Sequence, residues 1–133
     1  MNYSLDAGPL MAYLNNETGA EQTENVLTEP ESLCYMHFMN LCEIYYLYYR
    51  RGGVGVADAI VQDLLDIGII LRDDHDEAFW KAAASFKGRH ALSLPDAFCI
   101  ALAQRIGATV VTTDHAEFDP LVPLGYCPIH FVR

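Results

Sequence analysis

Short apolar segments with strand character alternate along the whole chain with segments whose apolar residues recur at helical spacing. Strands are expected at residues 2–6, 32–35, 69–71, 108–114 and 127–132. Helices are expected at residues 8–15, 17–29, 37–51, 54–68, 76–89, 93–107 and 115–125, and Gly52 and Gly53 end the third of them. This alternation predicts an α/β fold, with a central, mainly parallel sheet of about four to five short strands flanked by helices.

The length of 133 residues suits one compact domain, so we expect a single domain over residues 1–133. Hydrophobic residues make up 52% of the chain, which favours a folded protein over a disordered one. No apolar run approaches the roughly 18 residues of a membrane span. The segment "MNYSLDAGPL" also lacks the features of a signal peptide. We therefore expect a cytoplasmic protein without a membrane partner.

The four cysteines are Cys34, Cys42, Cys99 and Cys127. No two of them form a CxxC pair, and no histidine spacing completes a zinc pattern. We expect reduced, mostly buried cysteines with a structural role.

Eighteen acidic and eight basic residues give a formal net charge of −10. A protein that binds nucleic acid through a broad basic face usually has the opposite balance. Any contact with nucleic acid must therefore be local, or a partner must supply positive charge.

Four acidic residues occupy positions that favour a shared site. Asp6 and Asp114 follow predicted strands, and the carboxyl ends of parallel strands meet at one edge of a sheet. Asp96 begins a helix that is apolar nearly all round, and Glu43 is the only charge from Met39 to Tyr48.

Each of these acids also has an ordinary structural interpretation. Asp6 and Asp114 can cap helices, with Glu117 completing a capping box after Asp114. Asp96 fits the same arrangement after Ser93. Glu43 can lie at the rim of the core or pair with an arginine.

Convergence of the four carboxylates would require compensation, because clustered anions repel each other strongly. Hard divalent ions such as Mg²⁺ or Mn²⁺ suit a site made only of carboxylates. Metals held in this way commonly serve phosphoryl chemistry.

Four segments together resemble the PIN-domain nucleases and, within them, the VapC-like toxins of toxin–antitoxin pairs: "SLDAGPLMAYL", "NLCEIYYL", "LSLPDAFCIALAQRIGATVVTTDHAEFDPL" and "CPIHFV". The resemblance implies a PIN-like fold with Asp6, Glu43, Asp96 and Asp114 as catalytic acids. It implies that Asp6, Asp96 and Asp114 hold Mg²⁺ or Mn²⁺, while Glu43 holds a second ion or orients water. Hydrolysis of single-stranded or looped RNA would then leave a 5′-phosphate and a 3′-hydroxyl.

The chain departs from the family pattern at Gly8, where the family often has Ser or Thr, so a hydroxyl is expected to be missing. A fifth acid often follows the fourth, and either Glu117 or Asp119 fits that role. His115 is expected to be a surface residue rather than a metal ligand.

The basic residues Arg50, Arg51, Lys87 and Arg89 are candidates for contacts with RNA phosphates, although Lys87 and Arg89 also suit an ordinary helix end. The tyrosines of "YYLYYRR" (45–51) favour either core packing with a dimer face or partner groove, or base stacking. The resemblance implies a homodimer and a small antitoxin with a basic segment.

A metal-dependent ribonuclease acting as a toxin is the first functional hypothesis, and a standalone RNA-processing nuclease of the same kind is its variant. An inactive PIN-like binding module and another carboxylate–metal phosphohydrolase are the alternatives. The Asp-x-Asp loop of one such phosphohydrolase class is absent, because residue 8 is Gly.

Overall fold

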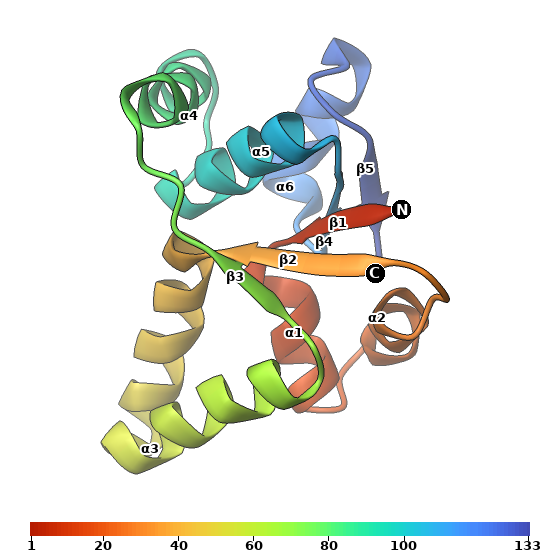
Figure 1. The fold of residues 1–133 in the computed structure, drawn as a ribbon, viewed down its shortest axis with the longest axis vertical. Helices are drawn as coiled ribbons and strands as arrows, with labels where there is room; N and C mark the ends of the chain where they lie inside the picture. Colours follow the sequence, from red (N-terminus) through yellow and green to blue (C-terminus); the bar gives the residue numbers. More distant parts are fainter.

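Five parallel strands form one sheet in the order β3-β2-β1-β4-β5, which confirms the predicted α/β class (Figure 1). The computed structural model describes all residues from 1 to 133. The strands are β1 (Asn2–Leu5), β2 (Leu33–His37), β3 (Ile70–Arg72), β4 (Thr109–Thr112) and β5 (Ile129–Phe131). The helices are α1 (Ala7–Leu14), α2 (Ala20–Leu27), α3 (Phe38–Asp66), α4 (Glu77–Arg89), α5 (Leu94–Ile106) and α6 (His115–Phe118), followed by the 3-10 helix η1 (Asp119–Leu124).

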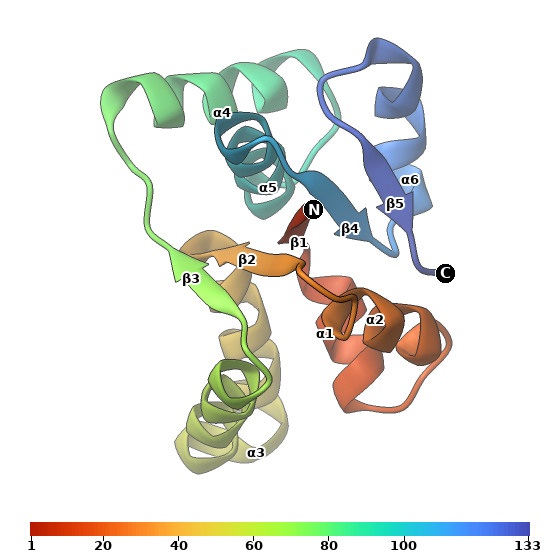
Figure 2. The ribbon, with the colours of Figure 1, turned by 45° about the vertical axis from the view of Figure 1, so that its right-hand side comes forward.

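The helices cover both faces of the sheet, so the molecule has three layers. Helices α1, α2 and α3 lie on one face, and α4, α5 and α6 lie on the other (Figures 1 and 2). Each face has its own apolar cluster. Leu10, Met36 and Ile44 belong to the first cluster, whereas Ile100 and Phe118 belong to the second. No helix is long and apolar enough to cross a membrane.

Helix α5 is the central packing element, as its apolar sequence predicts. It contacts α3, α4 and the strands β1, β2 and β4. Its buried alanines, including Ala97 and Ala101, are small and allow the helix to lie close to its neighbours. The Ser4 hydroxyl of β1 donates to the Cys99 carbonyl at 3.0 Å, which ties the helix to the middle of the sheet.

The order of the strands creates a switch point beside β1. The chain moves from β1 to β2 on one side, and β4 later pairs with β1 on the other side. At the carboxyl end of this pair, the Asp6 N–H donates to the Val111 carbonyl at 3.0 Å. Ligand sites in open α/β sheets form at such a point, beyond the carboxyl ends of the strands.

Helix α3 is a helical hairpin rather than one straight rod. Gly53 has φ 81° and ψ −171°, a backbone conformation open essentially to glycine alone, and the chain reverses there (Figure 1). The Tyr45 hydroxyl donates to Asp58 at 2.9 Å across the two arms. The break predicted at Gly52 and Gly53 is therefore confirmed as a kink within this element.

The four cysteines form no disulfide. Cys34 and Cys99 are buried, in line with a structural role, whereas Cys42 is exposed. Helix α2 is shorter than the expected 17–29, because Gly19 at φ 101° precedes its first turn.

Candidate metal centre

A pocket of about 280 Å³ lies beyond the carboxyl ends of β1 and β4. It contains all four acids singled out in the sequence, together with Glu117. The residues that line it are Asp6, Gly8, Glu43, Tyr46, Ser93, Asp96, Thr113, Asp114 and Glu117.

Asp6 is fixed in this pocket by the start of α1 and by the end of β4. Its carboxylate accepts hydrogen bonds from the Ala7 N–H at 2.7 Å and from the Thr112 hydroxyl at 2.9 Å. The same hydroxyl accepts from the Asp114 N–H at 3.0 Å, which couples the two acids. Asp6 thus caps a helix and also belongs to the site.

The electrostatic environment raises the pKa of Asp6 to about 6. Burial is the main cause, and the charges of Asp114 and Glu117 act in the same direction. The hydrogen bonds from Thr112 and Ala7 oppose the shift by stabilising the anion.

Ser93 caps helix α5, as the expected capping-box arrangement requires, but Asp96 does not complete the box. The Ser93 hydroxyl accepts from the Asp96 N–H at 3.3 Å, and the Ser93 N–H donates to Glu117 Oε1 at 3.1 Å. Glu117 therefore fills the place that Asp96 would take in a capping box. The buried Asp96 carboxylate accepts no hydrogen bond within the chain and is left to face the pocket.

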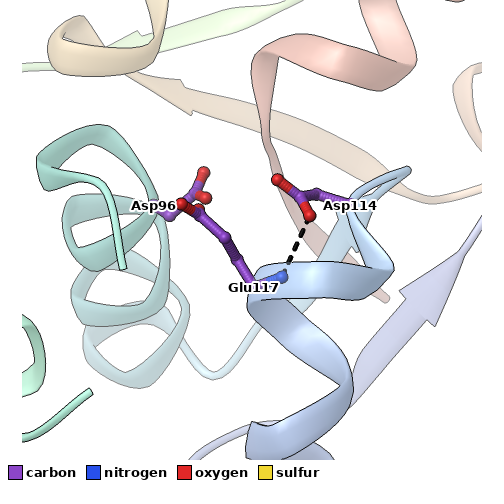
Figure 3. Close-up of side chains that lie close together, drawn as sticks. All are labelled: Asp96, Asp114 and Glu117. Atoms are coloured by element: carbon purple, nitrogen blue, oxygen red, sulfur yellow. Dashed lines mark hydrogen bonds between the residues drawn. The ribbon is translucent and has the colours of Figure 1, made fainter. Parts of the chain in front are cut away.

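Three carboxylates form the closest group, and they come from two elements (Figure 3). One oxygen each of Asp96, Asp114 and Glu117 lies within 4.8 Å of the others. Asp114 caps α6 and accepts from the Glu117 N–H at 3.0 Å. Glu117 Oε2 is buried and has no hydrogen-bond partner.

Of the two candidates for the fifth acid, the structure places Glu117 in the pocket and Asp119 outside it. Asp119 is exposed and lies 2.9 Å from His115 Nδ1. The His115 ring stacks on Phe131, with 4.1 Å between the ring centroids. His115 is a surface residue, as expected.

Glu43 projects into the same pocket from the first arm of α3. Half-burial raises the pKa of its carboxyl, and the charges of Asp6, Glu117 and Asp114 raise it further. Its sequence position among apolar residues is thus explained by an acidic pocket beside the core, and not by a pairing with arginine.

The donor set fits a hard divalent cation. Every ligand atom on offer is a carboxylate oxygen, the preferred donor for Mg²⁺ and Mn²⁺. A buried carboxylate oxygen without a partner is costly, and Glu117, a member of this group, has such an atom in its Oε2. A bound cation would remove both this cost and the mutual repulsion.

The hydroxyl expected to be missing at Gly8 is replaced from another position. A Cβ on Gly8 would lie 2.2 Å from Thr113 Oγ1, so the threonine hydroxyl occupies the space beside the glycine. Thr113 also lines the pocket. The site thus keeps a hydroxyl group.

Two of the four basic candidates lie away from the pocket. The Lys87 amine donates to the Leu92 carbonyl at 2.8 Å, and the Arg89 guanidinium lies over the rings of Phe86 and Tyr126. Neither base lines the pocket.

The other two candidates, Arg50 and Arg51, are on α3. Arg50 lies 4.9 Å from the ring centroid of Tyr46, which lines the pocket. Tyr46 is one of the tyrosines considered for base stacking, and it lies three residues after Glu43, on the same helix face.

The sequence matches the PIN domain family over residues 3–119. The chain belongs to the PIN domain family. This range contains all five acids of the pocket, and the resemblance seen in the sequence is confirmed.

Solved structures share the PIN fold of this chain at low sequence identity. VapBC2 from Rickettsia felis bound to a promoter DNA fragment is 12% identical, with a TM-score of 0.72 and coverage of 98% of each chain. DNA-bound VapBC from Salmonella typhimurium is 15% identical, with a TM-score of 0.72 and coverage of 100% of this chain and 99% of that chain.

VapC20 from Mycobacterium tuberculosis, a sarcin-ricin loop cleaving toxin, is 16% identical, with a TM-score of 0.65 and coverage of 83% and 87%. No curated protein sequence matches the chain. At these identities, the structural likeness is a likeness of fold.

The raised pKa of Asp6 predicts a specific pH dependence of stability. Between its ordinary value of 3.8 and about 6, the folded protein holds a proton that the unfolded chain has released. The free energy of unfolding therefore falls as pH rises through this window. The full shift corresponds to about 3 kcal/mol. Asp6→Asn removes this contribution, so the variant should gain stability relative to the wild type as pH rises.

Urea unfolding of chelator-treated protein at pH 4.5, 6 and 8 measures the difference in the free energy of unfolding between variant and wild type. These pH values run from inside the window set by the Asp6 pKa shift to above it. His37, whose pKa is lowered by burial, contributes with the opposite sign. His37 is present in both proteins, so its contribution largely cancels in the difference between their free energies of unfolding. A difference between variant and wild type that is constant across pH would contradict the prediction.

The close approach of Gly8 and Thr113 predicts a non-additive pair of substitutions. Gly8→Ala should lower the free energy of unfolding by about 1–3 kcal/mol, because the new Cβ meets Thr113 Oγ1. In a Thr113→Ala background, the same substitution should cost little, since the obstructing hydroxyl is gone. A double-mutant cycle by urea unfolding measures the coupling. Equal costs in both backgrounds would refute the contact.

Proposed function

We propose that the protein is a Mg²⁺- or Mn²⁺-dependent ribonuclease that hydrolyses RNA phosphodiester bonds. The observation that carries this proposal is the convergence of five carboxylates in one pocket, with a buried oxygen of Glu117 lacking any partner. Membership of the PIN domain family supports the same chemistry. A purely structural role would leave the mutual repulsion of these acids without compensation.

The geometry suggests different catalytic roles for the acids. A cation would bind between the carboxylates of Asp96, Asp114 and Glu117, since their oxygens form the closest group. Asp6 lines the same pocket and adds a further carboxylate beside them. When bound there, a divalent cation supplies positive charge that orients a phosphate and stabilises the charge developing on its oxygens.

Glu43 lies outside the closest group and suits a different task. We propose that its carboxylate orients the attacking water and accepts its proton. The raised pKa of Glu43 favours this role, because a stronger base takes up a proton more readily. In-line attack of the water oxygen on phosphorus would then break the P–O3′ bond, leaving a 5′-phosphate, and the departing 3′ oxygen would take a proton from solvent to become a 3′-hydroxyl.

Removal of the Asp96 carboxylate tests the proposed function. Asp96→Asn should lower Mn²⁺-dependent cleavage of single-stranded RNA by at least on the order of a hundredfold. Even residues that only support metal ligands cost about 10- to 100-fold when mutated. The variant should also lose the rise in melting temperature that Mn²⁺ gives the wild type. Asp119→Asn, which alters an exposed acid outside the pocket, is the matched control and should keep both properties.

Cleavage at the wild-type rate by the Asp96→Asn variant would refute the assignment. Tight binding of RNA without any cleavage by the wild type in Mg²⁺ or Mn²⁺ would instead favour an inactive binding module. Hydrolysis of small phosphate esters but not of RNA would favour another phosphohydrolase.

We further propose that the nuclease is the toxin of a toxin–antitoxin pair. The similar structures include a toxin–antitoxin complex from Klebsiella pneumoniae, 14% identical with a TM-score of 0.67 and coverage of 89% and 90%. The acidic pocket and the net charge of −10 suit a small partner with a basic segment. Arginine is the best match, because its planar fork meets carboxylates bidentately. The competing view is a standalone RNA-processing nuclease.

The partner and the oligomeric state can be tested together. If a small reading frame adjoins the gene for this chain, co-expression of the two and purification through a tag on this chain should yield a basic polypeptide. Light scattering of the chain alone should give the mass of a homodimer. The dimer stays a prediction. Tyr48 of the apolar helix is buried within the chain, whereas Tyr46 and Tyr49 are exposed. No co-purified polypeptide together with harmless expression would favour the standalone enzyme, and a monomer mass would refute the dimer.

A further inference from the structure

Tyr46 differs from the other tyrosines of the "YYLYY" segment in its surroundings. Tyr48 is buried and donates to Asn15 at 2.9 Å, and Tyr45 donates to Asp58. Tyr46 is 47% exposed, and its hydroxyl makes no hydrogen bond within the chain. It is also the one hydrophobic residue in the lining of the acidic pocket. A single aromatic wall thus stands beside the carboxylates.

Arg50 lies one helical turn after Tyr46, and its guanidinium is 4.9 Å from the ring centroid. Arg50 and Arg51 are the only two of the eight basic side chains that form neither an ion pair nor a hydrogen bond in the chain. The other six are held by such contacts: Arg72, Lys81, Lys87, Arg89, Arg105 and Arg133. The guanidinium N–H groups of these two arginines on α3 are therefore free to donate to a ligand.

We propose that Tyr46 and Arg50 form a subsite for the nucleotide next to the scissile phosphate of a single-stranded RNA. The Tyr46 ring stacks on the base, and the Arg50 guanidinium contacts the adjoining phosphate. The inference rests on the proposed nuclease function, because it places this nucleotide beside the carboxylate pocket. Stacking of this kind accepts any base, since every base offers a π-face.

The local positive charge beside Tyr46, in contrast to the net charge of the molecule, favours a nucleotide over a basic peptide at this position. An acidic protein must hold a polyanion through local positive charge, and the pocket itself repels phosphate unless a cation is bound. Arg50 supplies that charge beside Tyr46, which lines the pocket, and, unlike a lysine, offers a planar fork for phosphate oxygens. A segment of a protein partner is the alternative occupant of this surface, and the experiments below distinguish it from RNA.

Binding is measured in the Glu43→Gln background, which removes the proposed base for the attacking water, so that cleavage does not interfere, and keeps the three carboxylates proposed to hold the cation. The probe is a short, fluorescently labelled single-stranded RNA that the wild type cuts, in the presence of Mn²⁺. Tyr46→Ala should weaken binding by roughly tenfold, and Tyr46→Phe should retain it. Tyr49→Ala is the matched control, because Tyr49 is an equally exposed tyrosine of the same helix that does not line the pocket.

The arginine is tested by its salt dependence. Arg50→Gln should weaken binding and lower the slope of log affinity against log salt by about one, as expected for one lost phosphate contact. Arg51→Gln is the control, because Arg51 lies over the buried Tyr48 instead.

Replacement of single nucleotides by abasic residues identifies the stacked base. One abasic position should weaken binding to the parent and leave binding to Tyr46→Ala unchanged, because the two changes remove the same contact. In the active enzyme, Tyr46→Ala should raise KM more than it lowers kcat.

Equal effects of Tyr46→Ala and Tyr49→Ala would overturn the subsite and leave the nuclease function intact. Loss of antitoxin binding in Tyr46→Ala with unchanged RNA affinity would assign the surface to a protein partner and also overturn it. If the wild type neither cleaves nor binds any RNA, the proposed function fails and the subsite fails with it.

Discussion

Mutual repulsion among carboxylates at the carboxyl ends of β1 and β4 is the constraint on which the site depends. Five acids share one pocket, where burial raises the pKa values of Asp6 and Glu43 and the charges of the neighbouring acids raise them further. The chain offsets part of this cost with backbone N–H donors, because α1, α5 and α6 all begin at the pocket. The remaining charge, and the unpartnered Glu117 Oε2, call for a divalent cation.

Helix capping and a place in the acidic pocket are compatible roles for one side chain rather than alternatives. Asp6 and Asp114 each accept a backbone N–H at a helix start and still line the pocket. The sequence identifies these two acids because strand ends in a parallel sheet converge, and it identifies Asp96 and Glu43 because each lies among apolar residues. The fold class follows from the alternation of strand and helix periods in the same way.

Other features depend on contacts between distant segments and could not be predicted from the sequence. Glu117 enters the pocket because its Oε1 accepts from the Ser93 N–H, a bond across 24 residues, whereas Asp119 turns outward at the start of η1. The hydroxyl beside Gly8 comes from Thr113, in the short loop between β4 and α6. Tyr46 and Tyr48 read alike in the sequence, and only the packing of α3 shows that one is exposed and the other buried.

The central claim, that the carboxylate group binds a divalent cation, is tested most directly by anomalous scattering from crystals of the protein soaked in Mn²⁺. The predicted result is an anomalous difference peak between the carboxylates of Asp96, Asp114 and Glu117. A peak only at exposed acids such as Asp119, or none at this group at saturating Mn²⁺ and neutral pH, would contradict it.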